Sequence, residues 1–326
     1  MRIFSGIQPT GKIHIGNYLG ALKQFVELQE KNECIFSVVD LHAITIPYNP
    51  QDLYKNIFET VVCYLAAGID PEKSILFIQS SVKEHTELAW ILGTVTPSGD
   101  LHRMTQYKEK SKQFKGKVGA GILNYPILMA ADILLYKADL VPVGADQKQH
   151  VELTRTIARK FNKRFGKVFP EPEVKMKKEG AKIMALNNPK KKMSKSMPEG
   201  CLYLLDDPKE ITKKIMSAVT DSGKEIKYNP LRKPGISNLL TIYSLFSDKS
   251  IKETEKIFEN KNYSFLKKSL VKLLIESLEP FRRKKREFLK REIFLQEILK
   301  KGKKKAEAIA KSTMKEVYQK MGLPII

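Results

Sequence analysis

The chain has 326 residues, of which 42% are hydrophobic and 29% charged, an ordinary composition for a globular protein and a length that favours two domains. The formal net charge of +22 fits either a polyanionic partner or a generally lysine-rich surface. The segment before Gly11 lacks the apolar core of an export signal, and Asn124, Pro126 and Asp132 interrupt the most apolar stretch, so we expect neither secretion nor a membrane span.

Short apolar runs alternate with amphipathic stretches in the first half of the chain. The predicted strands are residues 2–7, 34–39, 74–79 and 139–143, and the predicted helices are residues 18–29, 53–67, 84–92 and 126–136. This alternation predicts an α/β fold, a Rossmann-like doubly wound parallel sheet. Because ligands bind beyond the carboxyl ends of such strands, the candidate segments are residues 8–10, 40–42, 79–81 and 144–147.

The pattern changes after about residue 206, where helical periodicity replaces the strand signals. The predicted helices are residues 208–219, 236–246, 251–258, 265–292 and 304–320. Residues 163–195 are rich in Lys, Pro, Gly and Asn, which predicts a loop-bearing connector. We therefore expect a Rossmann-like α/β domain over residues 1–205 and an all-helical C-terminal domain over residues 206–326.

The excess positive charge lies entirely in the second half. Residues 1–150 contain 15 Lys+Arg and 15 Asp+Glu, so 43 of the 58 basic and 21 of the 36 acidic residues lie in 151–326. A lysine-rich proteome would affect both halves. The asymmetry therefore favours a polyanion, such as a nucleic acid, as a partner of the second half only.

The three cysteines are Cys34, Cys63 and Cys201, which lie far apart and form no CxxC pair. This spacing indicates a reducing compartment, and we expect a cytoplasmic protein. It also argues against a structural zinc site.

A turn rich in Pro and Gly, residues 8–17, joins the first predicted strand to the first predicted helix. Backbone N–H groups at the start of that helix can hold a phosphate, and Gly16 allows an adenine ring to approach the backbone. His14 and Asn17 can donate hydrogen bonds to phosphate oxygens. Taken alone, the segment is also compatible with an ordinary strand-to-helix turn.

A second segment, Lys192-Met193-Ser194-Lys195-Ser196, places two lysines three residues apart among small hydroxyl residues. Such a loop can close over a triphosphate and neutralise the charge that builds on departing pyrophosphate. Taken alone, residues 190–195 also fit a solvated basic run.

In this order and at this separation, the two segments resemble the HIGH and KMSKS signatures of class I aminoacyl-tRNA synthetases, with Asn17 in place of the second histidine. The resemblance extends over essentially the whole chain to the bacterial tryptophanyl-tRNA synthetases. The further segments that carry it are residues 4–11, 40–43, 104–111, 125–136, 142–150, 218–221 and 233–240.

The predicted helix that ends at Tyr136 is apolar on all sides except for Asp132, which predicts a buried helix with a carboxylate that needs a partner. Tyr125, Met129 and Asp132 share one face, because they are spaced four and three residues apart. An apolar slot with one acceptor suits an indole, whose only polar atom is an N–H donor. From spacing alone, a structural aspartate remains an alternative; the resemblance implies that Asp132 recognises the indole.

The resemblance also implies roles for other residues. For tryptophan, it implies an apolar lining of Phe4, Ile133, Val141 and Val143, ammonium contacts from Tyr125 and Gln147, and Gln8 and His42 at the carboxylate side. For ATP, it implies Gln8, Pro9, Thr10, Gly16 and Asn17, a ribose turn of Gly144, Ala145 and Asp146, Ile183 at the adenine, and Lys192, Met193, Ser194, Lys195 and Ser196. Relatives often carry Glu where this chain has Ala145, so we expect Ala145 to contribute only its backbone.

The catalytic residues implied in this way are His14, Asn17, Lys110, Lys192 and Lys195. Lys110 is one of five lysines between residues 108 and 117, so ordinary surface charge is its alternative. His85, His102 and His150 receive no role.

The resemblance implies activation of L-tryptophan with ATP and Mg²⁺, followed by transfer to tRNA(Trp) by a homodimer. Its sibling, tyrosyl-tRNA synthetase, shares the fold and signatures, and a non-catalytic RNA-binding paralogue is the more distant alternative. A nucleotidyltransferase of the HxGH type would explain the first segment only.

Overall fold

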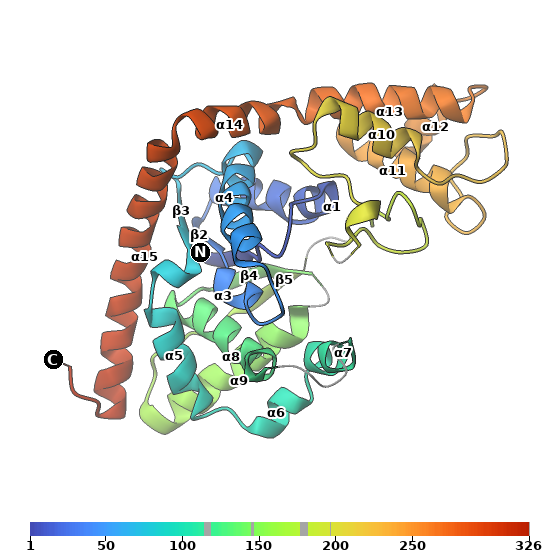
Figure 1. Ribbon diagram of the computed structural model, residues 1–326. Coiled ribbons are helices and arrows are strands. Elements are labelled where there is room, and N and C mark those ends of the chain that lie inside the picture. The colour runs from blue at the N-terminus through green and yellow to red at the C-terminus, as the bar shows by residue number, and fades with distance from the viewer. Residues whose placement is uncertain (114–118, 145–146, 177–181, 196, 326) are drawn as a thin grey trace.

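The computed structural model describes residues 1–113, 119–144, 147–176, 182–195 and 197–325. Within these ranges the chain forms a five-stranded parallel sheet with the strand order β3-β2-β1-β4-β5 (Figure 1). The strands are β1 (Arg2–Ile7), β2 (Glu33–Val38), β3 (Ser74–Ile78), β4 (Leu140–Val143) and β5 (Glu173–Met176). This is the doubly wound sheet that the strand–helix alternation predicted, and its strand order reverses at β1 and β4.

Helices cover both faces of the sheet because its central strands are apolar on both sides. In β1, Ile3 belongs to one hydrophobic core and Phe4 to the other, and in β2, Phe36 and Ile35 divide in the same way. The helices of the first core include α2 (Lys23–Gln29) and α4 (Pro50–Ala67). Those of the second include α5 (Glu84–Gly93), α8 (Ala120–Leu135) and α9 (Lys148–Phe165).

Short helical segments lie in the connections between the longer elements. They are α1 (Ile15–Asn17), η1 (Tyr18–Leu22), α3 (Asp40–Ala43), η2 (Gln79–Ser81), α6 (Ser98–His102), α7 (Thr105–Gln113) and η4 (Pro198–Gly200). The helix predicted over residues 18–29 therefore begins earlier, at Ile15, and contains one π-helical turn before α2.

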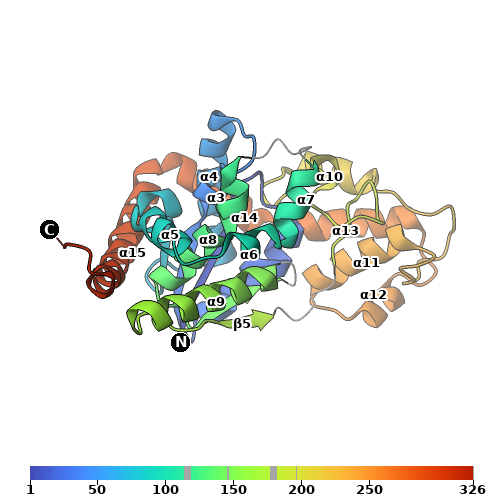
Figure 2. The ribbon, with the colours of Figure 1, turned by 90° about the horizontal axis from the view of Figure 1, so that it is seen from below.

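The second half of the chain is helical, as its periodicity predicted. Its helices are α10 (Pro208–Met216), α11 (Pro234–Ser247), α12 (Ile251–Ile257), α13 (Tyr263–Ser277), α14 (Glu279–Lys290) and α15 (Glu292–Met321). Helices α10 to α13 gather on one side of the sheet, whereas α14 crosses to α4 and α15 lies on the opposite side (Figures 1 and 2). None of the described helices is both long and apolar enough to cross a bilayer.

A fifth strand and a long helix lie where the sequence analysis placed none. The predicted connector, residues 163–195, contains β5, an edge strand in which Glu173 and Lys175 alternate with Val174 and Met176, and four residues are too few to give a clear strand signal. Helix α9 precedes it and buries one apolar face from Val151 to Phe161 among charged neighbours. Because most residues of α9 are polar, the sequence analysis did not detect its apolar face.

Prolines explain two further differences. Helix α8 begins at Ala120 and contains Pro126, whereas the sequence analysis began this helix at the proline. The single helix predicted over residues 265–292 is divided between α13 and α14, with Pro280 in the first turn of α14. Proline suits that position because its missing N–H would have no partner there.

Helix α15 packs against the edge strand β3 at a glycine. A Cβ at Gly302 would overlap the carbonyl oxygen of Leu76 in the β3 backbone. Glycine therefore allows the helix to approach the strand at backbone distance. The contact covers one open edge of the sheet, which otherwise presents unpaired N–H and C=O groups.

Replacement of Gly302 with Ala should lower the free energy of unfolding by about 1–3 kcal/mol, because helix and strand must separate to fit the methyl group. Gly20→Ala is the matched control, since a Cβ there meets nothing within 4 Å. Urea denaturation of both variants measures the difference. Equal stability of the two variants would show that the α15–β3 contact tolerates the added methyl group.

Candidate active site

His14 caps the short helix that follows β1. Its Nδ1 accepts a hydrogen bond from the backbone N–H of Asn17 at 3.2 Å, and Asn17 Oδ1 accepts one from the backbone N–H of His14 at 3.2 Å. Burial, together with the charges of Lys195 and Lys192, lowers the pKa of His14 to about 4. The ring is therefore neutral at pH 7, with its proton on Nε2. Such a ring can donate one hydrogen bond to an anion.

The second motif lies on a hairpin that docks beside this turn. The backbone N–H of Met193 donates to the carbonyl of Ile183 at 2.9 Å, which closes the hairpin. Just beyond it, the Leu202 carbonyl accepts from the Ile15 N–H at 2.9 Å. A Cβ at Gly16 would stand 3.8 Å from Cβ of Ile183, so the two expected adenine contacts are neighbours. Segments nearly 180 residues apart in the sequence thus meet.

The lysines of the hairpin add positive charge at this point. Lys195 Nζ donates a hydrogen bond to the carbonyl oxygen of Gln8 at 2.8 Å, and burial lowers the pKa of Lys195 to about 8. Lys192 is exposed, yet its charge contributes to the low pKa of His14. Lys110 lies in α7, and its expected contact with the phosphates stays a prediction.

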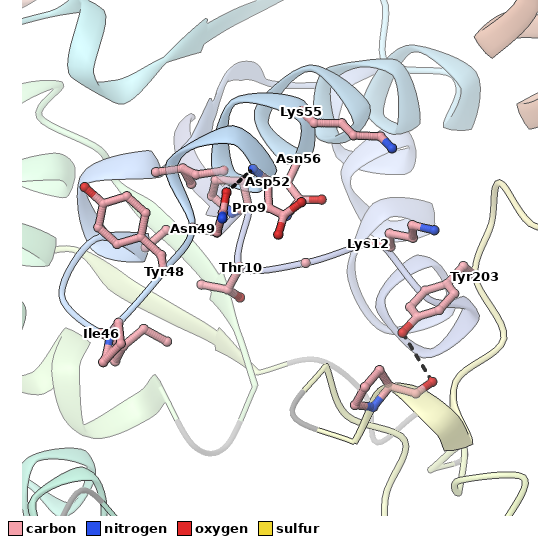
Figure 3. A pocket seen from close by; sticks show the side chains of 15 residues that line it. Pro9, Thr10, Lys12, Ile46, Tyr48, Asn49, Asp52, Lys55, Asn56 and Tyr203 are labelled. Atoms are coloured by element: carbon pink, nitrogen blue, oxygen red, sulfur yellow. Dashed lines mark hydrogen bonds between the residues drawn. The ribbon is translucent and has the colours of Figure 1, made fainter.

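A cavity of about 570 Å³ opens beside Pro9 and Thr10 (Figure 3). Residues from the β1–α1 turn, from the segment between α3 and α4 and from the start of α4 line it, and Tyr203 stands at its far side. The sequence analysis expected two of these residues, Pro9 and Thr10, at ATP and predicted nothing for the others.

A second cavity, of about 200 Å³, lies at the carboxyl ends of β1 and β4, where the strand order reverses. It brings together every residue that the sequence analysis expected at tryptophan. These residues are Phe4, Gln8, His42, Tyr125, Met129, Asp132, Ile133, Val141, Val143 and Gln147. Gly144, expected at the ribose, lines the same cavity.

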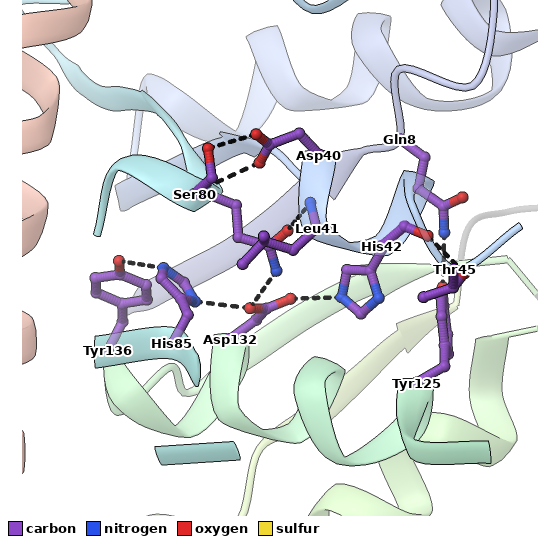
Figure 4. A network of polar contacts seen from close by, with 11 residues as sticks. Gln8, Asp40, Leu41, His42, Thr45, Ser80, His85, Tyr125, Asp132 and Tyr136 are labelled. Atoms are coloured by element: carbon purple, nitrogen blue, oxygen red, sulfur yellow. Dashed lines mark hydrogen bonds and ion pairs between the residues drawn. The ribbon is translucent and has the colours of Figure 1, made fainter. Parts of the chain in front are cut away.

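Asp132 is the centre of a buried hydrogen-bond network in this cavity (Figure 4). Its Oδ2 accepts from Nε2 of His42 at 2.8 Å. Its Oδ1 accepts from Nε2 of Gln79 and from Nδ1 of His85, each at 2.7 Å. Burial and the charge of Asp132 raise the pKa of Tyr136, whose hydroxyl donates to the other nitrogen of His85 at 2.8 Å. Both ring nitrogens of His85 thus have hydrogen-bond partners.

The network keeps Asp132 ionised although it is only 1% exposed. Burial by itself raises the pKa of a carboxyl group. Here the attraction to His42 and the hydrogen bonds from His42 and His85 outweigh burial and lower the pKa to about 2. A carboxylate has about four acceptor positions, of which three are filled. Among the described residues no fourth donor to Asp132 is found, so one acceptor position can serve a ligand donor.

Polar side chains beside the network extend it into the cavity. Gln8 Nε2 donates to the hydroxyl of Tyr125 at 2.9 Å, and the Tyr125 and His42 rings lie 4.4 Å apart. The buried Nδ1 of His42 has no hydrogen-bond partner among the described residues. A polar group of a ligand can supply that partner.

Three residues to which the sequence analysis gave no role complete this site. Gln79 follows β3 and was among the candidate segments at strand ends, whereas His85 was left without a role and Tyr136 was not considered. Only the fold brings the side chains of Gln79 and His85 to Asp132, and Tyr136 joins the network through His85.

Asn238 of α11 lies in one of the segments that carry the resemblance, but the sequence analysis assigned it no role. Its Oδ1 accepts from the backbone N–H of Met184, and its Nδ2 donates to the Met184 carbonyl, both at 2.9 Å. Asn238 is buried, and the Leu186 carbonyl accepts from the N–H of Val219 at 2.9 Å nearby. The hairpin of the second motif is thus attached to the helical region.

Three expected site residues, Ala145, Asp146 and Ser196, lie outside the described residues. Within the described ranges, no three His, Cys, Asp or Glu side chains are grouped so that they could hold a metal ion.

Comparisons with known proteins agree with this geometry. Residues 1–279 match the family described as tRNA synthetases class I (W and Y). The tryptophan–tRNA ligase of Caldanaerobacter subterraneus is 53% identical over 324 residues, which cover 99% of this chain and 98% of that protein. The tryptophan–tRNA ligase of Bacillus subtilis is 50% identical over 323 residues, which cover 98% and 97%.

A solved structure extends the likeness to three dimensions. The tryptophanyl-tRNA synthetase of Campylobacter jejuni, crystallised with ADP and tryptophan, is 38% identical and superposes with a TM-score of 0.88 over 99% of this chain and 100% of its own. Sequence and fold agree over the whole length. The chain therefore belongs to the class I tRNA synthetases of the tryptophan and tyrosine (W and Y) family.

Proposed function

We propose that this protein activates L-tryptophan with ATP and transfers it to tRNA(Trp). The observation that carries the proposal is Asp132, an ionised carboxylate with one open acceptor position in a cavity lined by Phe4, Ile133 and Val141. An indole fills such a cavity, and its single N–H finds the single acceptor. The identity of about 50% to tryptophan–tRNA ligases over the whole chain supports the same substrate.

In the first step, an oxygen of the tryptophan carboxylate attacks the α-phosphate of ATP in line, and pyrophosphate leaves. We propose that ATP enters as its Mg²⁺ complex, with the ion held by phosphate oxygens and water. Tyr125 and Gln147 orient the ammonium group, whereas Gln8 and His42 face the carboxylate. The step needs no covalent enzyme intermediate, so positioning and charge stabilisation account for the rate.

The cations of the hairpin stabilise the charge that develops on the phosphates. Lys192 and Lys195 approach the phosphates from the hairpin, and Lys110 approaches them from α7. Neutral His14 donates a hydrogen bond from Nε2 to a phosphate oxygen. Asn17 adds a side-chain amide at the start of α1, where backbone N–H groups favour an anion. Ile183 and Gly16 flank the adenine. The buried side chain of Met193 holds the hairpin in position.

In the second step, the 2′-hydroxyl at the 3′ end of the tRNA attacks the carbonyl carbon of the adenylate, and AMP leaves. We propose that residues 206–326 contact the anticodon region, because the excess of basic residues lies in this half. Exposed lysines supply salt-dependent affinity for phosphates, while unpaired bases require stacking and edge contacts.

Tyrosine is the nearest competing substrate. Its hydroxyl can reach Asp132, but its single ring leaves the volume of the second indole ring empty. Unfilled volume and mismatched polar groups together disfavour it. A non-catalytic RNA-binding protein is the other alternative, and it predicts no amino-acid-dependent chemistry.

Amino-acid-dependent exchange of pyrophosphate into ATP tests the proposal. Tryptophan should support exchange, and tyrosine should do so far less efficiently. Replacement of Asp132 with Ala should lower kcat/KM for tryptophan, because the indole N–H loses its acceptor. The corresponding loss of transition-state stabilisation should be at least about 2 kcal/mol.

Tyr136→Phe is the control for that variant, since it removes a hydroxyl of the network and leaves every hydrogen bond to Asp132 in place. It should retain most of the activity. A wild-type protein that exchanges equally well with tyrosine would contradict the tryptophan assignment, and an absence of exchange with either would favour the non-catalytic alternative.

The pKa of Lys195 predicts how ATP binding depends on pH. Because burial lowers this pKa to about 8, the free enzyme loses the charge as the pH rises through 8. The Kd for ATP should therefore increase about tenfold between pH 7 and pH 9.5, the loss expected for one charged hydrogen bond. Lys195→Arg stays charged and should remove this dependence. Calorimetric titration measures both; the same pH dependence in both proteins would exclude Lys195 as its source.

We propose that the protein is a cytoplasmic homodimer. The single tryptophan of the chain, Trp90 on α5, is 79% exposed, and burial of so large an apolar side chain favours association. Dilution should dissociate the dimer, and sedimentation velocity measures this dissociation. The fluorescence emission of Trp90 should shift to longer wavelength at the same time, because its side chain becomes exposed to water. A monomer at micromolar concentration, with unshifted emission, would contradict the dimer.

A further inference from the structure

The two carboxylate oxygens of Asp132 have different surroundings. Oδ1 accepts hydrogen bonds from both Gln79 and His85, each at 2.7 Å, so both of its acceptor positions are filled. Among the described residues, Oδ2 accepts a hydrogen bond from His42 alone, at 2.8 Å. The acceptor position that can serve a ligand therefore belongs to Oδ2.

The two sides of the carboxylate also differ in their access to the tryptophan cavity. Asp132 and His42 line this cavity, whereas Gln79 and His85 are fully buried and do not line it. His42 and His85 lie on opposite sides of the carboxylate, and the side of His42 continues toward Tyr125 (Figure 4). Oδ2 thus faces the cavity, and Oδ1 faces donors that lie outside it.

The ring of His85 is held in place by contacts of its own. It stacks on Phe77 with ring centres 5.8 Å apart, and its Nε2 lies 2.8 Å from the hydroxyl oxygen of Tyr136. Because an ionised carboxylate only accepts hydrogen bonds, Nδ1 of His85 carries the proton in the contact with Asp132. The ring cannot turn away from Asp132 without losing these contacts.

The orientation of the carboxylate matters because the torsion about its Cβ–Cγ bond is soft. Donors on both oxygens hold the plane of the group, and an N–H donor binds best when a lone pair points toward it. A recognition group that is displaced by a fraction of its own length loses much of its effect. A residue that fixes the carboxylate from behind can therefore control recognition at the front.

We infer that His85 is a positioning residue for tryptophan recognition: with Gln79 it occupies Oδ1 of Asp132 and thereby directs the open acceptor position on Oδ2 to the indole N–H. The inference rests on the proposed function and adds to it the residue that orients the recognising carboxylate. His85 itself does not touch the substrate. If His85 only satisfied a buried charge, its loss would affect all amino-acid substrates alike.

The test compares tryptophan with β-(3-benzothienyl)-L-alanine, in which sulfur replaces the indole N–H and the shape of the ring system is retained. Both are measured in pyrophosphate exchange, which needs no tRNA. The wild-type protein should prefer tryptophan by at least about tenfold in kcat/KM, as expected for one hydrogen bond to a charged acceptor. His85→Leu has a side chain of similar size without a donor. It should lower kcat/KM about tenfold for tryptophan and less than about twofold for the analogue.

Three further variants locate the source of this effect. His85→Asn should keep most of the preference although it loses the ring, because its amide nitrogen takes the place of Nδ1. His102→Leu is the matched control, since His102 is exposed and packs on Tyr107 with ring centres 5.3 Å apart; it should change neither substrate. Addition of His85→Leu to Asp132→Ala should lower the preference no further, because His85 acts through Asp132.

An equal fall for both substrates in His85→Leu would overturn the inference, as would an unchanged preference for tryptophan. A loss of preference in His85→Asn as large as that in His85→Leu would also contradict it, because the donated hydrogen bond would then not be the source. A wild-type protein that showed no preference for tryptophan over the analogue, or no exchange, would instead refute the proposed function.

Discussion

An ionised carboxylate that is almost inaccessible to water must be surrounded by donors, and Asp132 imposes this requirement on the centre of the molecule. Three elements besides its own helix supply these donors: His42 comes from α3, Gln79 from the segment after β3 and His85 from α5. Each donor can reach Asp132 only if the sheet and its helices have their observed order. The substrate cavity and the fold therefore depend on the same hydrogen bonds.

The sequence was sufficient to predict the sheet, the strand-end segments and the polar position on a buried helix. Those predictions depend on short-range patterns, such as apolar runs for β1 and β2 and the spacing of Tyr125, Met129 and Asp132. The partners of Asp132 were not predictable, because Gln79 and His85 are 53 and 47 residues away and carry no local signal. For the same reason, the edge strand β5 and the polar helix α9 were absent from the prediction.

The division at residue 205 was also a local prediction, made from a change in periodicity. Buried residues of α10, α11, α13 and α14 belong to the same core as those of α2 and α4, and Lys285 of α14 pairs with Glu59 of α4 at 2.9 Å. In addition, Asn238 binds the backbone of the hairpin that carries Lys192. Helix α11, which belongs to the region that we propose contacts RNA, is thus hydrogen-bonded to the hairpin that we propose binds ATP.

The α15 contact gives the chain a particular order of assembly during synthesis. The edge strand β3 is complete by residue 78, but Gly302, which covers it, emerges from the ribosome more than 200 residues later. Throughout that interval the unpaired backbone groups of β3 face solvent, where they can pair with another nascent chain. Helix α15 thus covers the edge of the sheet only late in synthesis. A chain whose synthesis stops before α15 keeps β3 exposed, and this strand can pair with other chains.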